Sequence, residues 1–383
     1  MESYRRTAND VSAANRNLAG VSDPVSHLNG HRAAAMDADS FHDASQRILS
    51  TVNTVIDGKS DAAELALTVL LAQGHLLLED VPGVGKTLLA KTLAKTIDCT
   101  VSRIQFTPDL LPSDVTGVSI YNQSSRLFEF RPGAVFANIV IGDEINRASA
   151  KTQSALLECM EEHQVTVDGT SYRLDEPFMV VATQNPIEME GTYPLPEAQR
   201  DRFMARISMG YPDKDAEIEM LETHQAASPL AKVSAVVTAA EVAAMITTVQ
   251  QVYVSQAVKE YTVSVGRATR ESQLLRLGAS PRSMLQLVRA AKATAALDAR
   301  DFVLPDDVVQ VAEAVLAHRI ILDRKAAGAG ETAHTVLQGI LSRLPVPQAP
   351  AGAGYTAGAG TAPGTRSQSA RNAASVAGSG RNR

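Results

Sequence analysis

Residues 79–87 of this 383-residue chain read EDVPGVGKT. The stretch ends like a phosphate-binding loop, with a glycine, a lysine and a hydroxyl residue in succession. Asp80, however, stands where the usual pattern G-x-x-x-x-G-K-[ST] has its first glycine. The same three residue types also meet by chance on ordinary surface helices. Whether this stretch binds phosphate therefore depends on the elements around it.

The flanking residues favour a phosphate site. An apolar run, HLLLED (75–80), leads into the loop, and TLLAKTLAKTI (87–97) follows it with Leu89, Leu93 and Ile97 spaced as on one helix face. A strand, a glycine-rich turn and a helix in this order direct backbone N–H groups at one point, where anions bind. The order argues against Lys86 being a solvated residue on a surface helix.

The candidate nucleotide-binding residues run from the turn into the helix: Pro82, Gly83, Val84, Gly85, Lys86, Thr87 and Leu88. Two of them, Gly83 and Gly85, permit unusual φ angles and a close approach of the main chain to phosphate oxygens. Lys86 would reach the β- and γ-phosphates, and the Thr87 hydroxyl would ligate Mg²⁺. Asp80 stands at the entrance of the loop, where glycine mainly eases the turn.

The pattern of apolar residues predicts an α/β fold followed by helices. From His75 to Met209 short apolar runs alternate with helical ones, as expected of a parallel sheet with helices on both faces. After Tyr211 we expect helices only. Three of them have start signals: Thr238 with Glu241, Ser280 with Pro281, and Pro305 with two aspartates. A last helix is expected over residues 332–344.

Four segments result from this pattern and from composition. We expect a disordered N-terminal tail (1–40), an α/β core (41–211), a small helical domain (212–344) and a low-complexity disordered tail rich in Gly, Ala, Pro and Ser (345–383). The C-terminal tail carries arginines without acidic residues, so it could touch an acidic partner or be simply solvated.

Composition excludes several classes of protein. The net charge of −6, from 36 basic and 42 acidic residues, implies no broad attraction to nucleic acid or anionic lipid. The two cysteines, Cys99 and Cys159, are far apart and fit a reducing compartment, with Cys159 expected as a buried small apolar residue. No apolar run reaches the ~18 residues of a membrane span, and no signal-peptide pattern opens the chain. We expect a soluble, cytoplasmic protein without membrane insertion.

A second motif lies in NIVIGDEIN (138–146), where an apolar run delivers Asp143 and Glu144 to the carboxyl end of a strand. In open α/β sheets this is the ligand side. Asp143 can hold Mg²⁺ through its water shell, and Glu144 can orient and deprotonate the attacking water. An acidic pair in this position is otherwise often a helix cap, but after a phosphate-binding loop the catalytic interpretation is the stronger one.

Two further residues complete the predicted site. Asn185 follows the apolar run FMVVAT (178–183) and could orient the lytic water, although it could also be a turn-forming residue before proline. Arg202, in PLPEAQRDRF (194–203), lies away from the chain's own loop and could act as an arginine finger on a neighbour's γ-phosphate. Arg200 and Arg206 are rivals, and any of the three could instead pair with a nearby acidic residue.

Taken together, these segments resemble the MoxR family of AAA+ ATPases. The resemblance rests on EDVPGVGKT, QFTPDLLPSDVTG (105–117), FRPGAVFANIVIGDEINRA (130–148), VATQNPIEMEGTYPLPEAQRDRF (181–203) and GASPRS (278–283). It implies an AAA+ P-loop NTPase core with a C-terminal helical lid, ATP and Mg²⁺ as ligands, and tolerance of a non-glycine at Asp80. It also implies homo-oligomeric rings, usually hexamers, and chaperone-like remodelling of a protein client, often with a von Willebrand factor A domain partner.

Carried over residue by residue, the resemblance makes Lys86 and Thr87 the Walker A pair and Asp143 and Glu144 the Walker B pair. Asn185 becomes the first sensor, and Arg202 the expected finger. Arg282 becomes the second sensor; it begins a helix, where a cation opposes the helix dipole, so an anionic partner is expected, although it could be an ordinary surface arginine. The chain departs from the family pattern at Arg200, where relatives usually carry leucine.

Two hairpin-like segments, YNQSSRLFEFRPGAVF (121–136) and VTVDGTSYRLDEPF (165–178), alternate polar and apolar residues around turn signals. In the resembled clade such insertions face the ring pore, though they could equally be supporting ribbons. The sequence leaves two alternatives to protein remodelling: a nucleic-acid motor and a metal-chelatase motor subunit. The balanced charge and the 4% aromatic content argue against nucleic acid.

Overall fold

The computed structural model describes residues 33–56, 58–185, 193–211 and 229–347. The expectations for most of both tails therefore lie outside the described residues. Helix α2 (Ala38–Asn53) begins just before residue 40, where the sequence placed the end of the N-terminal tail. Its start is capped by Asp37, whose side chain accepts a hydrogen bond from the Ser40 amide at 2.9 Å.

Five parallel strands form the central sheet, in the order β10-β1-β9-β6-β3. Their bounds are β1 Leu76–Glu79, β3 Val101–Gln105, β6 Ile139–Asp143, β9 Met179–Gln184 and β10 Ala205–Ile207. The predicted α/β fold with a parallel sheet is confirmed. Because all five strands run the same way, the segments that follow β1, β6 and β9 meet at one edge of the sheet.

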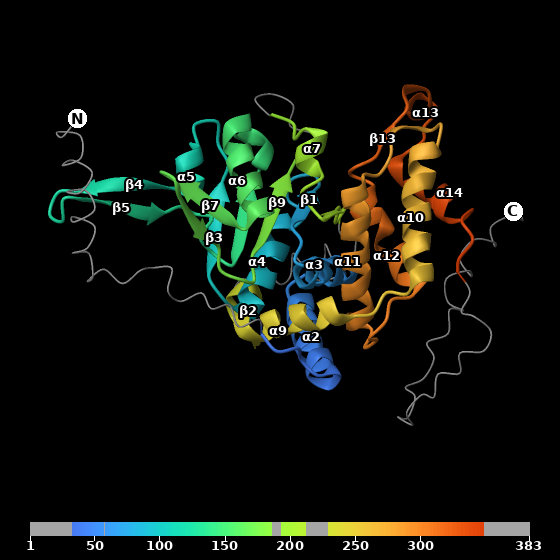
Figure 1. The fold of residues 1–383 in the computed structure, drawn as a ribbon, viewed down its shortest axis with the longest axis horizontal. Coiled ribbons are helices and arrows are strands. Elements are labelled where there is room, and N and C mark those ends of the chain that lie inside the picture. The colour runs from blue at the N-terminus through green and yellow to red at the C-terminus, as the bar shows by residue number, and fades with distance from the viewer. Residues whose placement is uncertain (1–32, 57, 186–192, 212–228, 348–383) are drawn as a thin grey trace, which may run out of the picture. The chain divides into compact units, whose positions relative to one another are not determined.

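Alternate residues of a strand pack into two hydrophobic cores, one on each face of the sheet. Leu76 and Leu78 of β1 pack into a core with helices α3 (Ser60–Leu71) and α4 (Lys86–Thr96), whereas Leu77 packs into a second core with α6 (Ala150–Glu162). Helices therefore cover both faces of the sheet, as Figure 1 shows. This two-sided burial explains why the strands read as continuous apolar runs rather than as alternating ones.

Both expected hairpins are present. Strands β4 (Gly117–Asn122) and β5 (Leu127–Pro132) pair antiparallel and project from the core (Figure 1). Strands β7 (Gln164–Val167) and β8 (Thr170–Arg173) also pair antiparallel. The turn between β7 and β8 consists of Asp168 and Gly169, both with positive φ (51° and 79°). This is the backbone conformation that an Asp-Gly pair adopts in two-residue hairpin turns.

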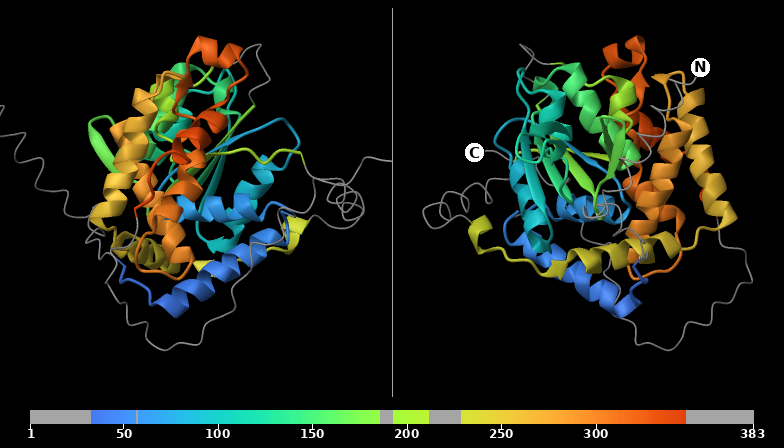
Figure 2. Two further views of the ribbon diagram at one scale, coloured as in Figure 1. Left: turned by 90° about the vertical axis from the view of Figure 1, so that its right-hand side faces the viewer. Right: turned by 60° about the vertical axis from the view of Figure 1, so that its left-hand side comes forward.

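The C-terminal helices form the lid, and their predicted start signals are confirmed. Thr238 and Glu241 form a capping box on α9 (Ala239–Gln251), and Ser280 caps α11 (Pro281–Leu297). The Asp307 side chain caps the start of α12 (Pro305–Leu316). The remaining helices are α10 (Gln256–Glu271), α13 (Arg324–Gly328) and α14 (Ala333–Leu341). Helix α9 lies beside α2 (Figure 2), where Arg47 pairs with Glu241 at 3.4 Å.

The expectation of helices only after Tyr211 is wrong in detail. Strand β11 (Val237–Thr238) pairs in parallel with β2 (Ile97–Asp98), and β12 (Leu275–Leu277) pairs antiparallel with β13 (Ile321–Leu322). Strands of two or three residues are too short to leave a periodic pattern in the sequence. They form because the backbone groups of these connections need hydrogen-bond partners.

Other short elements complete the chain: α5 (Pro112–Thr116), α7 (Glu197–Arg200) and the 3₁₀ turns Ile145–Arg147 and Pro229–Lys232. Burial raises the pKa of Cys159 to about 12 and that of Cys99 to about 11, which disfavours the reactive thiolate form of both. Cys159 is buried in α6, as expected. Within the described ranges, no helix has the length and apolar character that crossing a bilayer requires.

Candidate nucleotide-binding site

The loop between β1 and α4 has the backbone of a phosphate cradle. Gly83 and Gly85 have φ angles of 85° and 90°, a left-handed conformation that side chains with a Cβ rarely adopt. A Cβ placed on Gly83 would meet nothing within 4 Å, so the space in front of the loop is open. Gly85 is the N-cap of α4, so the amino-terminal end of this helix, which is the positive end of its dipole, opens at this space.

Asp80 accepts hydrogen bonds that the sequence did not predict. One carboxylate oxygen accepts a hydrogen bond from the Val81 amide at 2.8 Å, and the other accepts from the Ser208 hydroxyl at 3.0 Å and the Gly210 amide at 2.6 Å. Burial opposes its ionisation, but these hydrogen bonds together hold the Asp80 pKa below its ordinary value. Asp80 thus fastens the start of the loop to the segment that follows β10.

Lys86 lies across the mouth of the loop. Its Nζ donates to the backbone carbonyls of Asp80 and Gln184, the latter at 3.0 Å. These carbonyls follow β1 and end β9, two adjacent strands of the sheet. The ammonium group is therefore held over the carboxyl edge of the sheet, where it can meet phosphate oxygens.

The Thr87 hydroxyl donates to Asp143 Oδ1 at 2.8 Å. Asp143 ends β6 and its side chain is almost fully buried, while Arg103 of β3 pairs with its second oxygen at 2.7 Å. A hydroxyl and a carboxylate beside a phosphate cradle are the donor set that a phosphate-binding loop offers to Mg²⁺. Among the described residues, no group of three or more His, Cys, Asp or Glu side chains is arranged to hold a metal ion, so an ion here would also need phosphate and water oxygens.

Glu144 adopts a left-handed backbone conformation with φ of 58°, which is uncommon for a residue with a side chain and frequent at functional sites. Its amide donates to the Thr183 hydroxyl at 3.0 Å. Its carboxylate accepts from Gln105 Nε2 and pairs with Arg147, both at 3.0 Å. The carboxylate is thus drawn toward β3 and the turn that follows β6.

Asn185 is buried directly after β9, at the same edge of the sheet. Its backbone carbonyl accepts from Asn146 Nδ2 at 3.3 Å, which links the segments that follow β9 and β6. The structure therefore brings five predicted residues to one sheet edge: Lys86, Thr87, Asp143, Glu144 and Asn185. Pro186, the basis of the alternative turn interpretation, lies outside the described residues.

Arg202 and Arg282 lie elsewhere, and they lie together. Arg202 Nε pairs with Glu161 Oε2 at 3.0 Å, and an Nη of Arg282 pairs with Oε1 of the same carboxylate at 2.8 Å. The anionic partner expected for Arg282 is thus Glu161, at the end of α6. Of the rivals to Arg202, Arg206 pairs with Glu79 at 2.7 Å.

This pair of arginines occupies the edge of the sheet opposite the loop. The Met204 amide donates to the His75 carbonyl at 2.8 Å, and His75 precedes β1, whereas the loop follows β1. Four strand residues at ~3.3 Å each separate the two edges by about 13 Å. Among the described residues, the ion pairs of both arginines are made with Glu161 and not with the loop.

Comparison with known proteins agrees with this geometry. A family model described as ATPase family associated with various cellular activities (AAA) matches residues 75–205, and one described as AAA lid domain matches residues 267–340. Chaperone MoxR1 of Mycobacterium tuberculosis is 41% identical over 312 residues, which cover 79% of this chain and 82% of that protein. The chain belongs to the MoxR family of AAA+ ATPases.

Two other relatives and one solved structure extend the match. Uncharacterized protein YeaC of Bacillus subtilis is 48% identical over 81% of this chain and 97% of its own length. Protein MoxR of Methylorubrum extorquens is 30% identical over 74% of this chain and 89% of its own length. The crystal structure of a putative ATPase from Cytophaga hutchinsonii superposes with a TM-score of 0.75 at 41% identity, covering 81% of this chain and 97% of that one.

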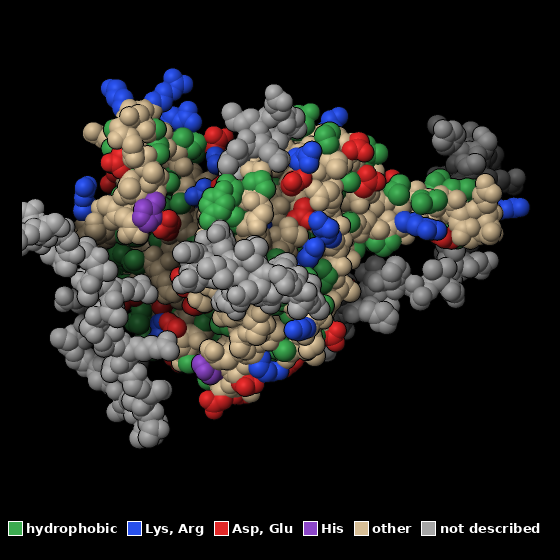
Figure 3. Space-filling model, turned by 180° about the vertical axis from the view of Figure 1, so that it is seen from behind, with side chains coloured by type: hydrophobic (Ala, Val, Ile, Leu, Met, Phe, Trp, Pro, Cys, Tyr) green, Lys and Arg blue, Asp and Glu red, His purple; other side chains and the backbone are tan. Residues whose placement is uncertain are grey.

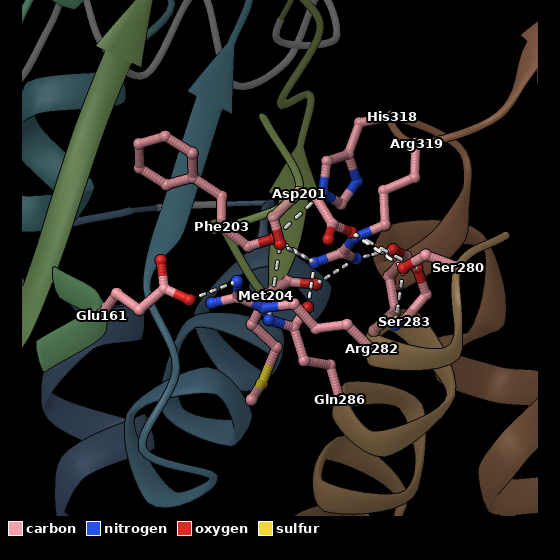
Figure 4. A network of polar contacts seen from close by, with 11 residues as sticks. Glu161, Asp201, Phe203, Met204, Ser280, Arg282, Ser283, Gln286, His318 and Arg319 are labelled. Atoms are coloured by element: carbon pink, nitrogen blue, oxygen red, sulfur yellow. Dashed lines mark hydrogen bonds and ion pairs between the residues drawn. The ribbon is translucent and has the colours of Figure 1, made fainter. Parts of the chain in front are cut away.

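Several polar residues of this MoxR-family site were not found from the sequence. Arg103 and Gln105 alternate along β3 and come into register with β6, so only the strand pairing places them beside the acidic pair. Arg319, near the opposite edge of the sheet, is a further residue that the sequence did not reveal. It is buried after α12, where its Nε pairs with Asp201 at 2.8 Å and its Nη atoms reach the Met204 carbonyl at 3.0 Å and that of Phe203 (Figure 4). No local pattern marks it.

Proposed function

We propose that this chain hydrolyses ATP with Mg²⁺ at the edge formed by β1, β6 and β9, and that it does so in a ring of identical subunits. The observation that carries the proposal is the 2.8 Å contact between Thr87 and Asp143, with Lys86 and Glu144 at the same sheet edge. Two sequence motifs 56 residues apart thus meet where Mg²⁺ and phosphates would be held together.

Each residue then has a role in phosphoryl transfer. The loop amides and Lys86 would bind the phosphates, while Thr87 and Asp143 would hold the ion, which would neutralise phosphate charge. Glu144 orients the attacking water and takes its proton. Asn185 orients the same water from the adjacent strand. For Glu144 to reach the water, its contacts with Gln105 and Arg147 must loosen.

The opposite position of Arg202 and Arg282 supports action between subunits. Both guanidinium groups lie across the sheet from their own loop, partly exposed and on a shared carboxylate. In a ring with head-to-tail contacts, one edge of each subunit meets the other edge of the next. We therefore assign both arginines to the γ-phosphate of the neighbour, with Arg202 as the finger. A hexamer is the expected ring, as in the family generally.

Mixing two inactive variants tests this arrangement. Glu144→Gln removes the base and keeps Arg202, whereas Arg202→Ala removes the finger and keeps the base. In an equal mixture of randomly assembled subunits, about a quarter of the interfaces combine an intact base with an intact finger, so the ATPase rate should recover toward that fraction. A mixture as inactive as its parents would refute action between subunits.

Remodelling of a protein client is the proposed use of this turnover, and MoxR1 carries the name chaperone. The hairpin of β4 and β5 offers an apolar contact surface: Phe128 is 75% exposed, with Leu127, Tyr121, Ile120 and Val118 also exposed. Figure 3 shows hydrophobic and basic side chains on this projection. A partner with a von Willebrand factor A domain is part of the proposal.

Two additions to an ATPase assay separate this function from its main rival. A von Willebrand factor A domain protein that co-purifies with the chain should raise the rate, and Phe128→Ala should reduce that stimulation while leaving the basal rate unchanged. Several-fold stimulation by DNA or RNA, with a steep dependence on salt, would favour a nucleic-acid motor instead.

A further inference from the structure

The arginines of the proposed finger face belong to a small polar pocket at the opposite sheet edge from the loop. The pocket has a volume of about 90 Å³, and its walls come from the core and the lid. Its charged lining residues are Arg202, Arg282, Arg289 and Glu161. Among the described residues that line it, Glu161 is the only acidic one. Three guanidinium groups therefore line the pocket beside one carboxylate, and two of them, those of Arg202 and Arg282, pair with it.

The histidines of this pocket do not add charge. Desolvation by burial lowers the pKa of His75 to about 3 and also lowers that of His163, so both rings are neutral near pH 7. Arg289 is occupied by the carbonyls of Ala72 and Gln73, at 2.6 and 2.8 Å. The lining thus has a net positive charge, and its two partly exposed arginines, Arg202 and Arg282, both point at Glu161.

The backbone that carries these two arginines is held by one buried hub. Arg319 pairs with Asp201 at 2.8 Å and donates to the carbonyls of Phe203 and Met204. The backbone is therefore held on both sides of Arg202. The hydroxyls of Ser280 and Ser283, which flank Arg282, lie 3.4 Å from the same Asp201 oxygen. Figure 4 shows both arginine-bearing segments converging on this hub.

Because the backbone at Arg202 and Arg282 is fixed and the ends of their side chains are partly exposed, the guanidinium groups are the parts that can move. The side chains of Arg202, Arg282 and Glu161 are 28%, 39% and 36% exposed, so a group on another molecule can reach them. The two pairs are also weak enough to exchange, since ion pairs at such exposure contribute little. A tetrahedral oxyanion offers several acceptor oxygens to two guanidinium groups where Glu161 offers two.

We propose that Glu161 is the resting counter-ion of Arg202 and Arg282, and that a phosphate oxyanion replaces it in this pocket. Identifying that oxyanion as the γ-phosphate of a neighbouring subunit rests on the proposed function. Glu161 then competes with the nucleotide for both arginines. This competition raises the protein concentration at which neighbouring subunits form an active interface. It touches none of the reacting atoms and acts only by holding the two arginines in the resting state.

Inorganic phosphate tests the pocket without requiring ATP hydrolysis. Glu161→Gln keeps the shape and removes the charge, so calorimetric titration should show phosphate binding about three- to tenfold tighter than in the unaltered protein. Adding Arg202→Ala and Arg282→Ala should abolish the gain. Glu162→Gln, which removes the exposed neighbouring charge, is the matched control and should change nothing. Unchanged or weaker binding by Glu161→Gln would overturn the proposal.

The ATPase rate measured against protein concentration provides a second readout. Loss of the competitor should lower the protein concentration at half-maximal rate several-fold and leave kcat unchanged. If Glu161 instead held the arginines in their productive geometry, kcat would fall. Glu161→Asp retains the charge on a shorter side chain that cannot keep both pairs, so an intermediate shift is expected. If Glu161→Gln fails to fold, the shift measured for Glu161→Asp tests the competitor role of Glu161 in its place. If the protein without substitutions showed no ATPase activity, the proposed function would be refuted. The phosphate titration would still test the role of Glu161.

Discussion

Replacing Asp80 with glycine would restore the usual phosphate-loop pattern, and we predict that it destabilises the protein. Asp80 is 9% exposed, and its carboxylate accepts three hydrogen bonds, from Val81, Ser208 and Gly210. Glycine would remove all three and leave the Gly210 amide and the Ser208 hydroxyl without this acceptor. The end of β1 would then no longer be fastened to the segment after β10.

The magnitude follows from these contacts. A hydrogen bond to a charged acceptor contributes about 1.5–3 kcal/mol, but three bonds to one carboxylate are coupled and do not add. The backbone freedom of glycine costs a further ~0.5–1 kcal/mol. We expect a loss of about 3–4 kcal/mol for Asp80→Gly, and about half of that for Asp80→Asn, which keeps one acceptor oxygen but no charge.

Urea denaturation at several pH values measures both losses. Because the folded-state pKa of Asp80 lies below its ordinary value of 3.8, the stabilisation is fully present above that value and is lost as the pH falls through the folded-state pKa. The difference between the unaltered protein and Asp80→Asn should therefore be constant near neutral pH and shrink in acid. An Asp80→Gly protein as stable as the parent, or a difference independent of pH, would refute this reasoning.

Three further predictions concern the site and its supports. Lys86→Ala should weaken ATP binding by about 10- to 100-fold, through loss of a charge-assisted contact to phosphate, and equilibrium binding of a fluorescent ATP analogue would measure it; unchanged affinity would exclude the phosphate role. Glu144→Gln should bind ATP normally and turn over about 10²–10⁴-fold more slowly in a phosphate-release assay, whereas brisk turnover would show that another group is the base. Asp201→Ala should lower the free energy of unfolding by about 3 kcal/mol, because it leaves the buried guanidinium of Arg319 without its counter-ion; in thermal denaturation the exposed Asp298→Ala should cost under about 1 kcal/mol, and equal losses would contradict the buried-pair account.

The sequence predicted those parts of the site that local patterns encode. The apolar runs ending at Asp80, Asp143 and Gln184 marked three parallel strands, so their carboxyl ends had to meet at one edge. The glycines of the loop, Lys86 and Thr87 followed from the spacing of one short motif. Helix caps were equally local, which explains why the starts of the lid helices were predicted well.

Contacts between distant segments could not be predicted in this way. Asp80 was assigned only a turn-entry position, because its partners lie 128 and 130 residues further along the chain. Nothing in the sequence paired Glu161 with Arg202 and Arg282, since the three residues come from different elements. Arg319 follows an apolar helical run and belongs to no recognisable motif, and its burial depends on the packing of the lid on the core.

The central claim is that Lys86, Asp143 and Glu144 surround one magnesium-bound nucleotide. Calorimetric titration of ATP into the Glu144→Gln protein, with and without Mg²⁺, tests it most directly because hydrolysis is suppressed. We predict one nucleotide bound per chain when Mg²⁺ is present and clearly weaker binding when EDTA removes it. Absence of heat on titration, or affinity that does not depend on Mg²⁺, would contradict the account.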